Sequence, residues 1–314
     1  AWEIEQTPSV SPHDCVGSNL NLHTRRGKLM RSVPRENEAV NEVWLSDRDR
    51  FAYEGVNAED RLQQPMVKKA DGWQPVDWEE ALHIAAQALR ERVENQGADQ
   101  LGMLVSPSAT LEEMSLLSQL ADGMGVSNID HRLRQVDFTG QDQQPVFPFL
   151  GQTIEELEQV DAALVVGANP RKDQPIIGHR LRKAAHAGAS IMFINPVDYE
   201  YTFDIAHKSI VPPSHMVKSL AGVAAALLQA KKARAPEALQ AVVEQTLPDA
   251  NEQAMADALA GADNAVILLG IGAGMHPAFS TLRALGTLIA EQSGAKLGFL
   301  SDGANSAGAN QKEK

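Results

Sequence analysis

The sequence predicts an α/β protein in which a small β-rich N-terminal subdomain is followed by a doubly wound parallel-sheet domain. Three observations support this fold class. An N-terminal segment alternates polar and apolar residues, later apolar runs show no such alternation, and helical segments separate these runs. Strands that are apolar on both faces and separated by helices form parallel sheets covered on both sides. The apolar runs span residues 101–105, 162–166, 191–194 and 265–269.

The β-rich domain is expected at residues 1–62. Residues 19–34 alternate around Gly27, a pattern that predicts a β-hairpin with glycine in its turn. This region is basic in an otherwise acidic chain, which is typical either of a solvated face or of a docking surface for an acidic neighbour. The basic residues are Arg25, Arg26, Lys28, Arg31, Arg35, Arg48 and Arg50.

The α/β region is expected at residues 63–314, and a further boundary could lie near 231–237, where basic residues and a proline follow a helix. Three positions in this region predict the start of a helix. Asp77, Thr110 and Thr153 are each followed three residues later by a glutamate and then by apolar residues, the pattern of a capping box. We therefore expect a helix to begin at each of them.

Composition narrows the classes of function. The net charge of −13 argues against a nucleic-acid-binding protein, because neutralising phosphates requires a basic surface. No apolar run approaches the length of a membrane span, so direct membrane insertion is not expected. The chain begins at Ala1 without a signal-peptide pattern and stops soon after a strand-like run, so we expect a truncated domain excised from a longer polypeptide.

Four positions near the N-terminus carry the spacing of an iron–sulfur ligand segment. Two, three and twenty-seven residues separate them, as they would separate four cysteines that bind a cubane cluster. Serine hydroxyls and a lone carboxylate do not replace four thiolates, so the frame of a cluster site is present without its ligands. The only cysteine, Cys15, lies one residue out of register, and His13 is the one histidine beside these positions. The four positions are Ser11, Asp14, Ser18 and Ser46.

The segments Pro8 to Asn19 and Trp44 to Tyr53 resemble the middle of the large peripheral-arm iron–sulfur subunit of proton-pumping NADH:quinone oxidoreductase, the G subunit of bacterial complex I. The resemblance covers nearly the whole chain. It implies a ferredoxin-like N-terminal part that carries iron–sulfur clusters, followed by a part built like molybdopterin oxidoreductases such as formate dehydrogenase. This chain resembles the second part. Some members of the family keep four cysteines and one extra cluster, whereas this sequence is similar to the mitochondrial-type branch that lost them.

The resemblance implies a role inside a complex in which electrons pass from NADH through flavin and iron–sulfur clusters to quinone. This fragment would be a scaffold or assembly region without a catalytic residue, metal or cofactor of its own, and it would be inactive in isolation. The clusters would lie in the N-terminal part of the full subunit. Its partners would be other peripheral-arm subunits, at the cytoplasmic face of the bacterial inner membrane. A variant of this hypothesis is that Asp14 or Cys15 holds a degenerate cluster.

Two loops are similar to the pterin-binding loops of molybdopterin oxidoreductases. Gly167, Asn169 and Pro170 match the Gly-x-Asn-Pro turn of that family, whereas the second loop has Asn195-Pro196-Val197 in place of the usual Asp-Pro-Arg. An acidic residue would accept from a guanine edge, and an arginine would clamp phosphate through two hydrogen bonds. Because both are replaced, we expect these positions to be degenerate. The alternative is a molybdopterin-binding, formate dehydrogenase-like oxidoreductase domain.

A glycine-rich turn leaves a third hypothesis open. Gly270, Gly272 and Gly274 follow a predicted strand and precede a helix, which is the context of a dinucleotide-binding turn. However, Met275 stands where that fingerprint has its third glycine, and no acidic residue follows at the expected distance. The turn could belong to a free-standing nucleotide-binding module, or it could use glycine for backbone conformation alone.

Overall fold

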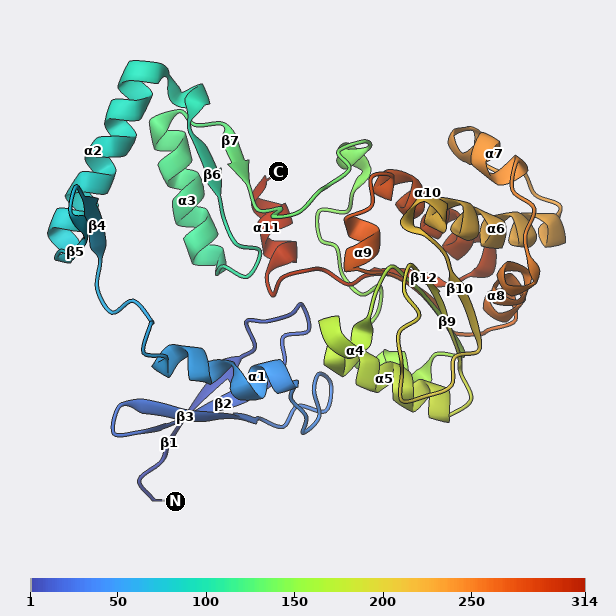
Figure 1. The fold of residues 1–314 in the computed structure, drawn as a ribbon. Helices are drawn as coiled ribbons and strands as arrows, with labels where there is room; N and C mark the ends of the chain where they lie inside the picture. The colour runs from blue at the N-terminus through green and yellow to red at the C-terminus, as the bar shows by residue number, and fades with distance from the viewer. Residues whose placement is uncertain (1, 314) are drawn as a thin grey trace.

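The computed structural model describes residues 2–313, which form three units (Figure 1). We call residues 2–57 the N-terminal unit, residues 66–130 the outer lobe and residues 150–300 the sheet unit. The predicted α/β fold class is confirmed, since an antiparallel N-terminal sheet precedes a five-stranded parallel one. Of the helices in the described residues, none combines the length and the apolarity that a membrane span requires.

The N-terminal unit is a three-stranded antiparallel sheet in the order β1-β2-β3. Arg26 and Gly27 form the hairpin turn with positive φ values of 51° and 75°, where glycine is favoured. Helix α1 (Asp47–Phe51) and the 3-10 helix η1 (Ala52–Asn57) follow. The strands are β1 (Glu5–Val10), β2 (Asn19–Arg25) and β3 (Lys28–Pro34).

The outer lobe contains two of the predicted helix starts. Asp77 caps α2 (Trp78–Gln96), and Thr110 forms a complete capping box at α3 (Leu111–Met124). The apolar run at 101–105 forms strand β6, but β6 pairs only with β7 and lies outside the main sheet. The other elements are β4 (Met66–Lys69), β5 (Gly72–Pro75), η2 (Ala98–Gln100), β6 (Gly102–Leu104) and β7 (Asn128–Asp130).

The sheet unit is a five-stranded parallel sheet in the order β10-β9-β8-β11-β12. Every residue of β8 and β11 is buried, as the uninterrupted apolar runs predicted. The strand order reverses between these two central strands, which makes the space at their carboxyl ends the switch point of the sheet. The strands are β8 (Ala162–Val166), β9 (Ser190–Asn195), β10 (His207–Ile210), β11 (Ala265–Leu269) and β12 (Lys296–Phe299).

Helices cover both faces of this sheet (Figure 1). On one face, α5 packs on Ala163 and Val165, and on the other, α6, α8 and α10 pack on Leu164 and Val166. The helices are α4 (Pro170–Asp173), α5 (Pro175–His186), α6 (Pro213–Lys231), α7 (Glu237–Glu244), α8 (Ala250–Ala260), α9 (Ile271–Gly274) and α10 (Phe279–Ser293), with η3 (Gln141–Gln143) and α11 (Ser306–Glu313) in the flanking segments.

Two segments differ from the simplest interpretation of the sequence. Thr153 makes the capping-box bonds with Glu156, but the turn that follows is the short 3-10 helix η4 (Glu155–Gln159) and not an α-helix. The chain must enter β8 at Ala162, so no room remains for further turns. The segment 231–237 connects α6 to α7, and the buried residues on both sides of it belong to the same hydrophobic core.

Candidate functional site

The four positions with the cluster spacing come together in the N-terminal unit. Ser11 N donates to Ser18 O at 2.9 Å, which places the first and third positions side by side. Ser11 Oγ and Ser46 Oγ both donate to the carboxylate of Asp49, the latter at 2.8 Å. All four positions are buried, with exposed fractions of 3% for Ser11, 1% for Asp14, 0% for Ser18 and 4% for Ser46.

Asp49 is the centre of this arrangement, and the sequence analysis did not identify it. His13 Nδ1 lies 2.8 Å from Asp49 Oδ1, and the Asp49 N–H donates to Ser46 Oγ at 3.0 Å, so that Ser46 also caps α1. The pattern Ser46-x-x-Asp49 is a helix-start signal that could have found it. We call Ser11, His13, Ser46 and Asp49 the Asp49 cluster. Both serine hydroxyls of this cluster donate to the buried Asp49 carboxylate.

The groups beside this cluster do not fit a cubane iron–sulfur centre. Burial raises the pKa of the single thiol, Cys15, to about 12, so this thiol stays protonated at neutral pH. Burial also raises the pKa of the Asp14 carboxyl, and this outweighs the Val16 amide and Arg48, which lower it. One protonated thiol and one carboxyl do not supply the four deprotonated sulfur ligands that such a cluster needs. Within the described part of the chain, no three His, Cys, Asp or Glu side chains gather as metal ligands.

The switch point of the sheet, between β8 and β11, is closed by its own turns. Gly272 N and Ala273 N donate to Gly167 O at 2.7 and 3.3 Å. A Cβ atom on Gly167 would lie 2.3 Å from Ala273 N, and one on Gly270 would lie 2.2 Å from Ala168 Cβ. The glycines therefore let two turns touch, so the backbone that would cradle a phosphate contacts backbone instead.

The other degenerate pterin-loop positions stabilise the same turns. Asn195, at the end of β9, accepts from Ala168 N and donates to Ala168 O, both at 2.9 Å, and is 2% exposed. Asn169 N donates to Asp173 Oδ2 at 3.1 Å, and the buried Pro170 begins α4. Since both ends of the Asn195 amide bind the chain itself, this side chain is poorly placed to recognise a base edge. That these positions bind no cofactor stays a prediction.

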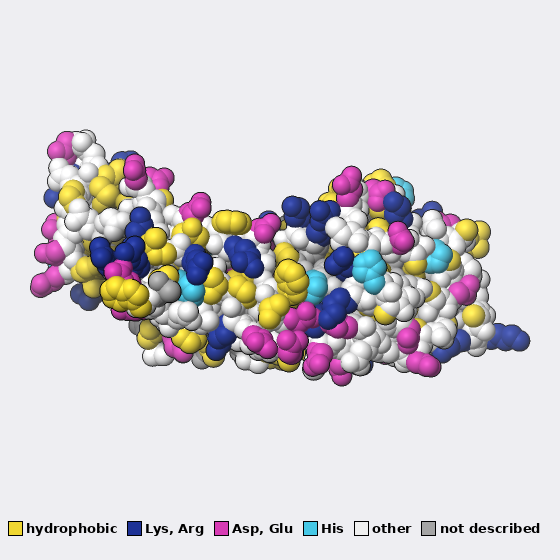
Figure 2. All heavy atoms as spheres, turned by 90° about the horizontal axis from the view of Figure 1, so that it is seen from below, with side chains coloured by type: hydrophobic (Ala, Val, Ile, Leu, Met, Phe, Trp, Pro, Cys, Tyr) yellow, Lys and Arg dark blue, Asp and Glu magenta, His cyan; other side chains and the backbone are white. Residues whose placement is uncertain are grey.

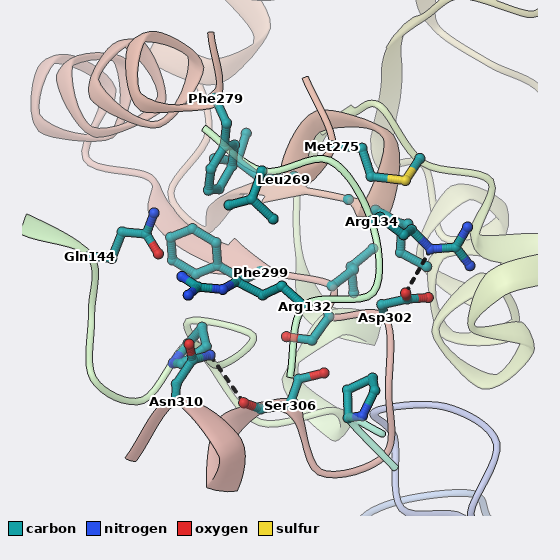
Figure 3. A pocket seen from close by; sticks show the side chains of 18 of the residues that line it. Arg132, Arg134, Gln144, Leu269, Met275, Phe279, Phe299, Asp302, Ser306 and Asn310 are labelled. Atoms are coloured by element: carbon teal, nitrogen blue, oxygen red, sulfur yellow. Dashed lines mark hydrogen bonds and ion pairs between the residues drawn. The ribbon is translucent and has the colours of Figure 1, made fainter. Parts of the chain in front are cut away.

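A cavity of about 180 Å³ lies beyond the carboxyl ends of β11 and β12 (Figure 3). Arg134 Nε donates to Asp302 Oδ2 at 2.8 Å across its mouth, and the buried Arg283 donates to the carbonyls of Gly140 and Gln143. Both arginines are thus paired within the chain. Of the residues that line this cavity, only those of the Gly270 turn were singled out from the sequence. The apolar lining includes Leu269, Met275, Phe279 and Phe299.

An ion cluster around the buried Arg180 fixes the N-terminal unit to α5. Arg180, 2% exposed, donates to Glu42 Oε1 at 2.8 Å, to Glu158 and to Val40 O at 3.0 Å. Lys183 Nζ lies 2.7 Å from Glu42 Oε1 and 2.6 Å from Glu158 Oε1. Burial would raise the pKa of Glu42, but its hydrogen bond from Lys183 and the charge of Arg180 lower it to about 2. We call these four charged residues the Arg180 cluster.

The basic residues of the hairpin region are partly neutralised within the chain. Arg25 and Arg26 lie 2.5 and 3.6 Å from the Glu3 carboxylate, which neutralises part of their charge, whereas Arg35 donates to the uncharged Asn19 amide, at Oδ1, at 2.6 Å. Figure 2 shows Lys and Arg side chains gathered on the N-terminal unit, with apolar side chains between them. Both interpretations of this surface, a solvated face and a docking surface, therefore stay open.

Comparison with known proteins identifies the family. A model described as molybdopterin oxidoreductase matches residues 61–312, and one described as the 4Fe-4S domain of NDSU1/NuoG-like NADH-ubiquinone oxidoreductase matches residues 4–54. Acetylene hydratase from Pelobacter acetylenicus has a similar fold, with a TM-score of 0.66 and 14% identity over 90% of this chain and 43% of its own. At this identity the likeness shows the fold alone.

The relatives agree with the resemblance found in the sequence. The G subunit of NADH-quinone oxidoreductase from Rickettsia bellii (strain RML369-C) is 32% identical over 188 residues, which are 60% of this chain and 27% of that protein. The mitochondrial NADH dehydrogenase [ubiquinone] iron-sulfur protein 1 of Solanum tuberosum is 32% identical over 218 residues, 67% of this chain and 28% of its own length. This chain thus spans little more than a quarter of these relatives. It belongs to the molybdopterin oxidoreductase family, and its similarity to the G subunit of NADH-quinone oxidoreductase is confirmed.

Proposed function

We propose that this chain is the molybdopterin-oxidoreductase-like region of a subunit of NADH:quinone oxidoreductase, and that it acts there as a scaffold without a cofactor of its own. The Asp49 cluster carries this proposal. Ser11 and Ser46 stand at two of the four ligand positions, and their hydroxyls donate to one buried carboxylate. The Ser11 and Ser46 hydroxyls therefore have a partner without a metal, whereas the buried Ser18 Oγ has no hydrogen-bond partner among the described residues.

The contacts that join the units also support the proposed scaffold role. The Arg180 cluster holds residues 40–42 against α5, and Arg48 donates to both Asp14 Oδ2 at 3.4 Å and Asp173 O at 3.1 Å. A cluster-bearing segment that precedes the N-terminal unit would thereby be fixed in position relative to the sheet unit. In this proposal the partners are other peripheral-arm subunits, and the chain is held at the cytoplasmic face of the bacterial inner membrane through the complex.

Metal content tests the cofactor-free part of the proposal. The chain is produced in a host that makes both iron–sulfur clusters and molybdopterin, and the purified protein is analysed for iron and molybdenum. We expect less than about a tenth of an equivalent of either metal, because the thiolate ligands are replaced. Stoichiometric iron would overturn the cofactor-free scaffold and favour the degenerate cluster at Asp14 or Cys15.

Assembly of the complex tests the scaffold part. Asp49→Ala in the full-length subunit removes the acceptor of the two serine hydroxyls and should lower the amount of assembled complex. The control is Asp47→Ala, which removes an exposed carboxylate from the same short helix. Cluster signals in electron paramagnetic resonance, normalised to assembled complex, should be unchanged in both. Normal assembly with Asp49→Ala, or after deletion of residues 65–314, would contradict the scaffold role.

The alternative functions have less support from the geometry. A pterin at the switch point would need the turns after β8 and β11 to separate, although Gly272 N and Gly167 O are joined at 2.7 Å. The same contact opposes a nucleotide at the Gly270 turn. A pterin released by acid extraction of the purified chain, or heat from titration with NADH, would restore one of these alternatives.

A further inference from the structure

The cavity beyond the carboxyl ends of β11 and β12 has room for a small organic molecule. Its volume of about 180 Å³ is below the roughly 300–1,000 Å³ of sites for drug-sized ligands, and it is too small for a dinucleotide. An apolar cavity of about 150 Å³ holds a benzene molecule. The space therefore fits one six-membered ring with a small substituent. Figure 3 shows Phe279 and Leu269 on one side of this space and Ser306 and Asn310 on the opposite side.

The charged side chains that line this cavity are mostly positive. Arg132, Arg134 and Arg283 all line it. Among the described residues, Asp302 is the one carboxylate in the lining, although the sequence as a whole has a net charge of −13. Asp130 binds Arg132 at 2.8 Å, and Asp302 binds Arg134 at 2.8 Å. A hollow lined by one sign of charge with apolar walls concentrates small ions of the opposite sign, so this cavity favours anions.

Arg283 carries a buried charge without a carboxylate bound to it. It is 8% exposed and donates to the carbonyls of Gly140 and Gln143, and within residues 2–313 its Nε has no hydrogen-bond partner. Burial lowers the pKa of its guanidinium, and the charge of Asp137 offsets only part of this effect. Asp137 itself accepts from Ser280 Oγ at 2.6 Å. An anion placed beside Arg283 would therefore stabilise a charge that the chain leaves incompletely compensated.

Helix α10 places this cation beside an aromatic wall. Phe279 and Arg283 are four residues apart, so they lie on the same face of α10, and both line the cavity. Leu269 and Phe299, from the ends of β11 and β12, continue the apolar wall. We propose that the cavity binds a small aromatic carboxylate, whose ring packs against Phe279 and Phe299 and whose carboxylate lies beside Arg283. The scaffold function does not require this ligand, so the two proposals stand or fall separately.

Fluorine NMR of 4-fluorobenzoate with the full-length subunit tests the class of ligand. Binding broadens the fluorine signal, and a titration should give a dissociation constant of about 1 mM or below, as for other ligands of about ten non-hydrogen atoms. 4-Fluorobenzamide has the same shape without the charge and should bind at least about tenfold more weakly. Acetate, which lacks the ring, should displace the probe only at concentrations at least about tenfold above those of benzoate. No binding at millimolar concentrations, or equal affinity for the amide, would overturn the proposal.

Gly274 allows the cavity to be filled without a clash. It lines the cavity, and a Cβ atom added to it has no atom within 4 Å. Gly274→Leu should therefore keep the midpoint of thermal unfolding and weaken binding of 4-fluorobenzoate at least about tenfold, because the ligand would overpack the cavity. Gly123→Leu is the matched control, since its added Cβ is equally free of contacts but lies on α3, outside the cavity. Unchanged affinity in Gly274→Leu would mean that the probe binds elsewhere and would overturn the proposal.

Arg283→Gln separates the charge of the site from its shape. Glutamine keeps an amide donor for the loop carbonyls but carries no charge. The dissociation constant of 4-fluorobenzamide divided by that of 4-fluorobenzoate should fall from at least about ten to about one. Arg182→Gln, at an exposed arginine on α5 outside the cavity, should leave this ratio unchanged. A general loosening of the cavity would weaken both probes alike, so an unchanged ratio in Arg283→Gln would overturn the placement of the carboxylate beside Arg283.

Discussion

Helices α2 and α6 have the same length and opposite environments. Each spans 19 residues, but α6 has eleven buried residues and α2 has none. Different interactions therefore stabilise the two helices. Asp77 caps α2 through its side chain, whereas α6 begins at Pro213 without a side-chain cap and is held by the core between the sheet and α8 and α10. Local signals can therefore define a helix whose packing partner lies elsewhere, while burial defines α6 without them.

The same contrast separates the sheet unit from the outer lobe. Five strands with both faces covered form a closed core, whereas the lobe holds two separate two-stranded sheets, β4–β5 and β6–β7, and the partly exposed helices α2 and α3. We therefore expect substitutions to lower the free energy of unfolding most at two places. One is the sheet unit, where backbone turns are closely packed, and the other is the Arg180 cluster that joins this unit to the N-terminal unit. Substitutions should be tolerated in the lobe of the isolated chain.

The largest effect is expected at the switch point. Gly167→Val places a Cβ atom 2.3 Å from Ala273 N at a residue with φ of +62°, and should destabilise the chain by more than about 4 kcal/mol. Gly188→Ala is the control, since its φ is +105° but no atom lies within 4 Å of the added Cβ, and it should cost only about 1–2 kcal/mol. Urea unfolding measures both. Similar losses would mean that the two turns do not depend on close contact.

The next effect is expected at the joint between units. Arg180→Met leaves Glu42 and Glu158 facing each other with only Lys183, and should cost about 3–5 kcal/mol, as for other broken buried ion clusters. Lys183→Met is the comparison, because the Lys183 side chain is 40% exposed and should cost about 1 kcal/mol or less. Proteolysis of residues 35–45 should accelerate in the first variant alone. Unchanged cleavage in Arg180→Met would mean that other contacts hold the two units together.

The Arg180 cluster should also make stability depend on pH. The pKa of Glu42 falls from 4.5 to about 2 on folding, so its stabilising effect is complete above pH 4.5 and is lost as the pH falls toward 2. Glu42→Gln should therefore be less stable than the native chain near neutral pH, and the difference should shrink in acid. A difference in the free energy of unfolding that stays constant over this range would contradict the depressed pKa.

The sequence predicted those parts of the fold that depend on residues close to one another along the chain. The runs at 162–166, 191–194 and 265–269 became strands because each is apolar enough to be buried on both faces. Asp77 and Thr110 mark real helix starts because a cap is a bond between residues three apart. Thr153 makes the same bonds but starts only a 3-10 turn, because the following strand sets where the chain must go.

The parts that were missed depend on contacts between distant residues. Arg180 meets Glu42 across 138 positions, and Ser11 meets Asp49 across 38, so no local pattern could pair them. The four cluster positions could be found because a ligand spacing is itself a sequence pattern. Asp49 accepts hydrogen bonds from Ser11 and Ser46, but it is not one of the four spaced positions, so the ligand spacing could not identify it.

The smallest effect is expected on the exposed face of α2. Leu82 is 62% exposed, so Leu82→Ala in the chain of residues 1–314 removes little buried surface and should change the free energy of unfolding by less than about 0.5 kcal/mol. Leu220→Ala, at a fully buried position in α6, should cost about 2–5 kcal/mol in the same chain. If Leu82→Ala instead cost as much as Leu220→Ala, the face of α2 would already be covered within this chain or between its copies. Both helices would then be covered, and they would differ only in the segment that covers each of them.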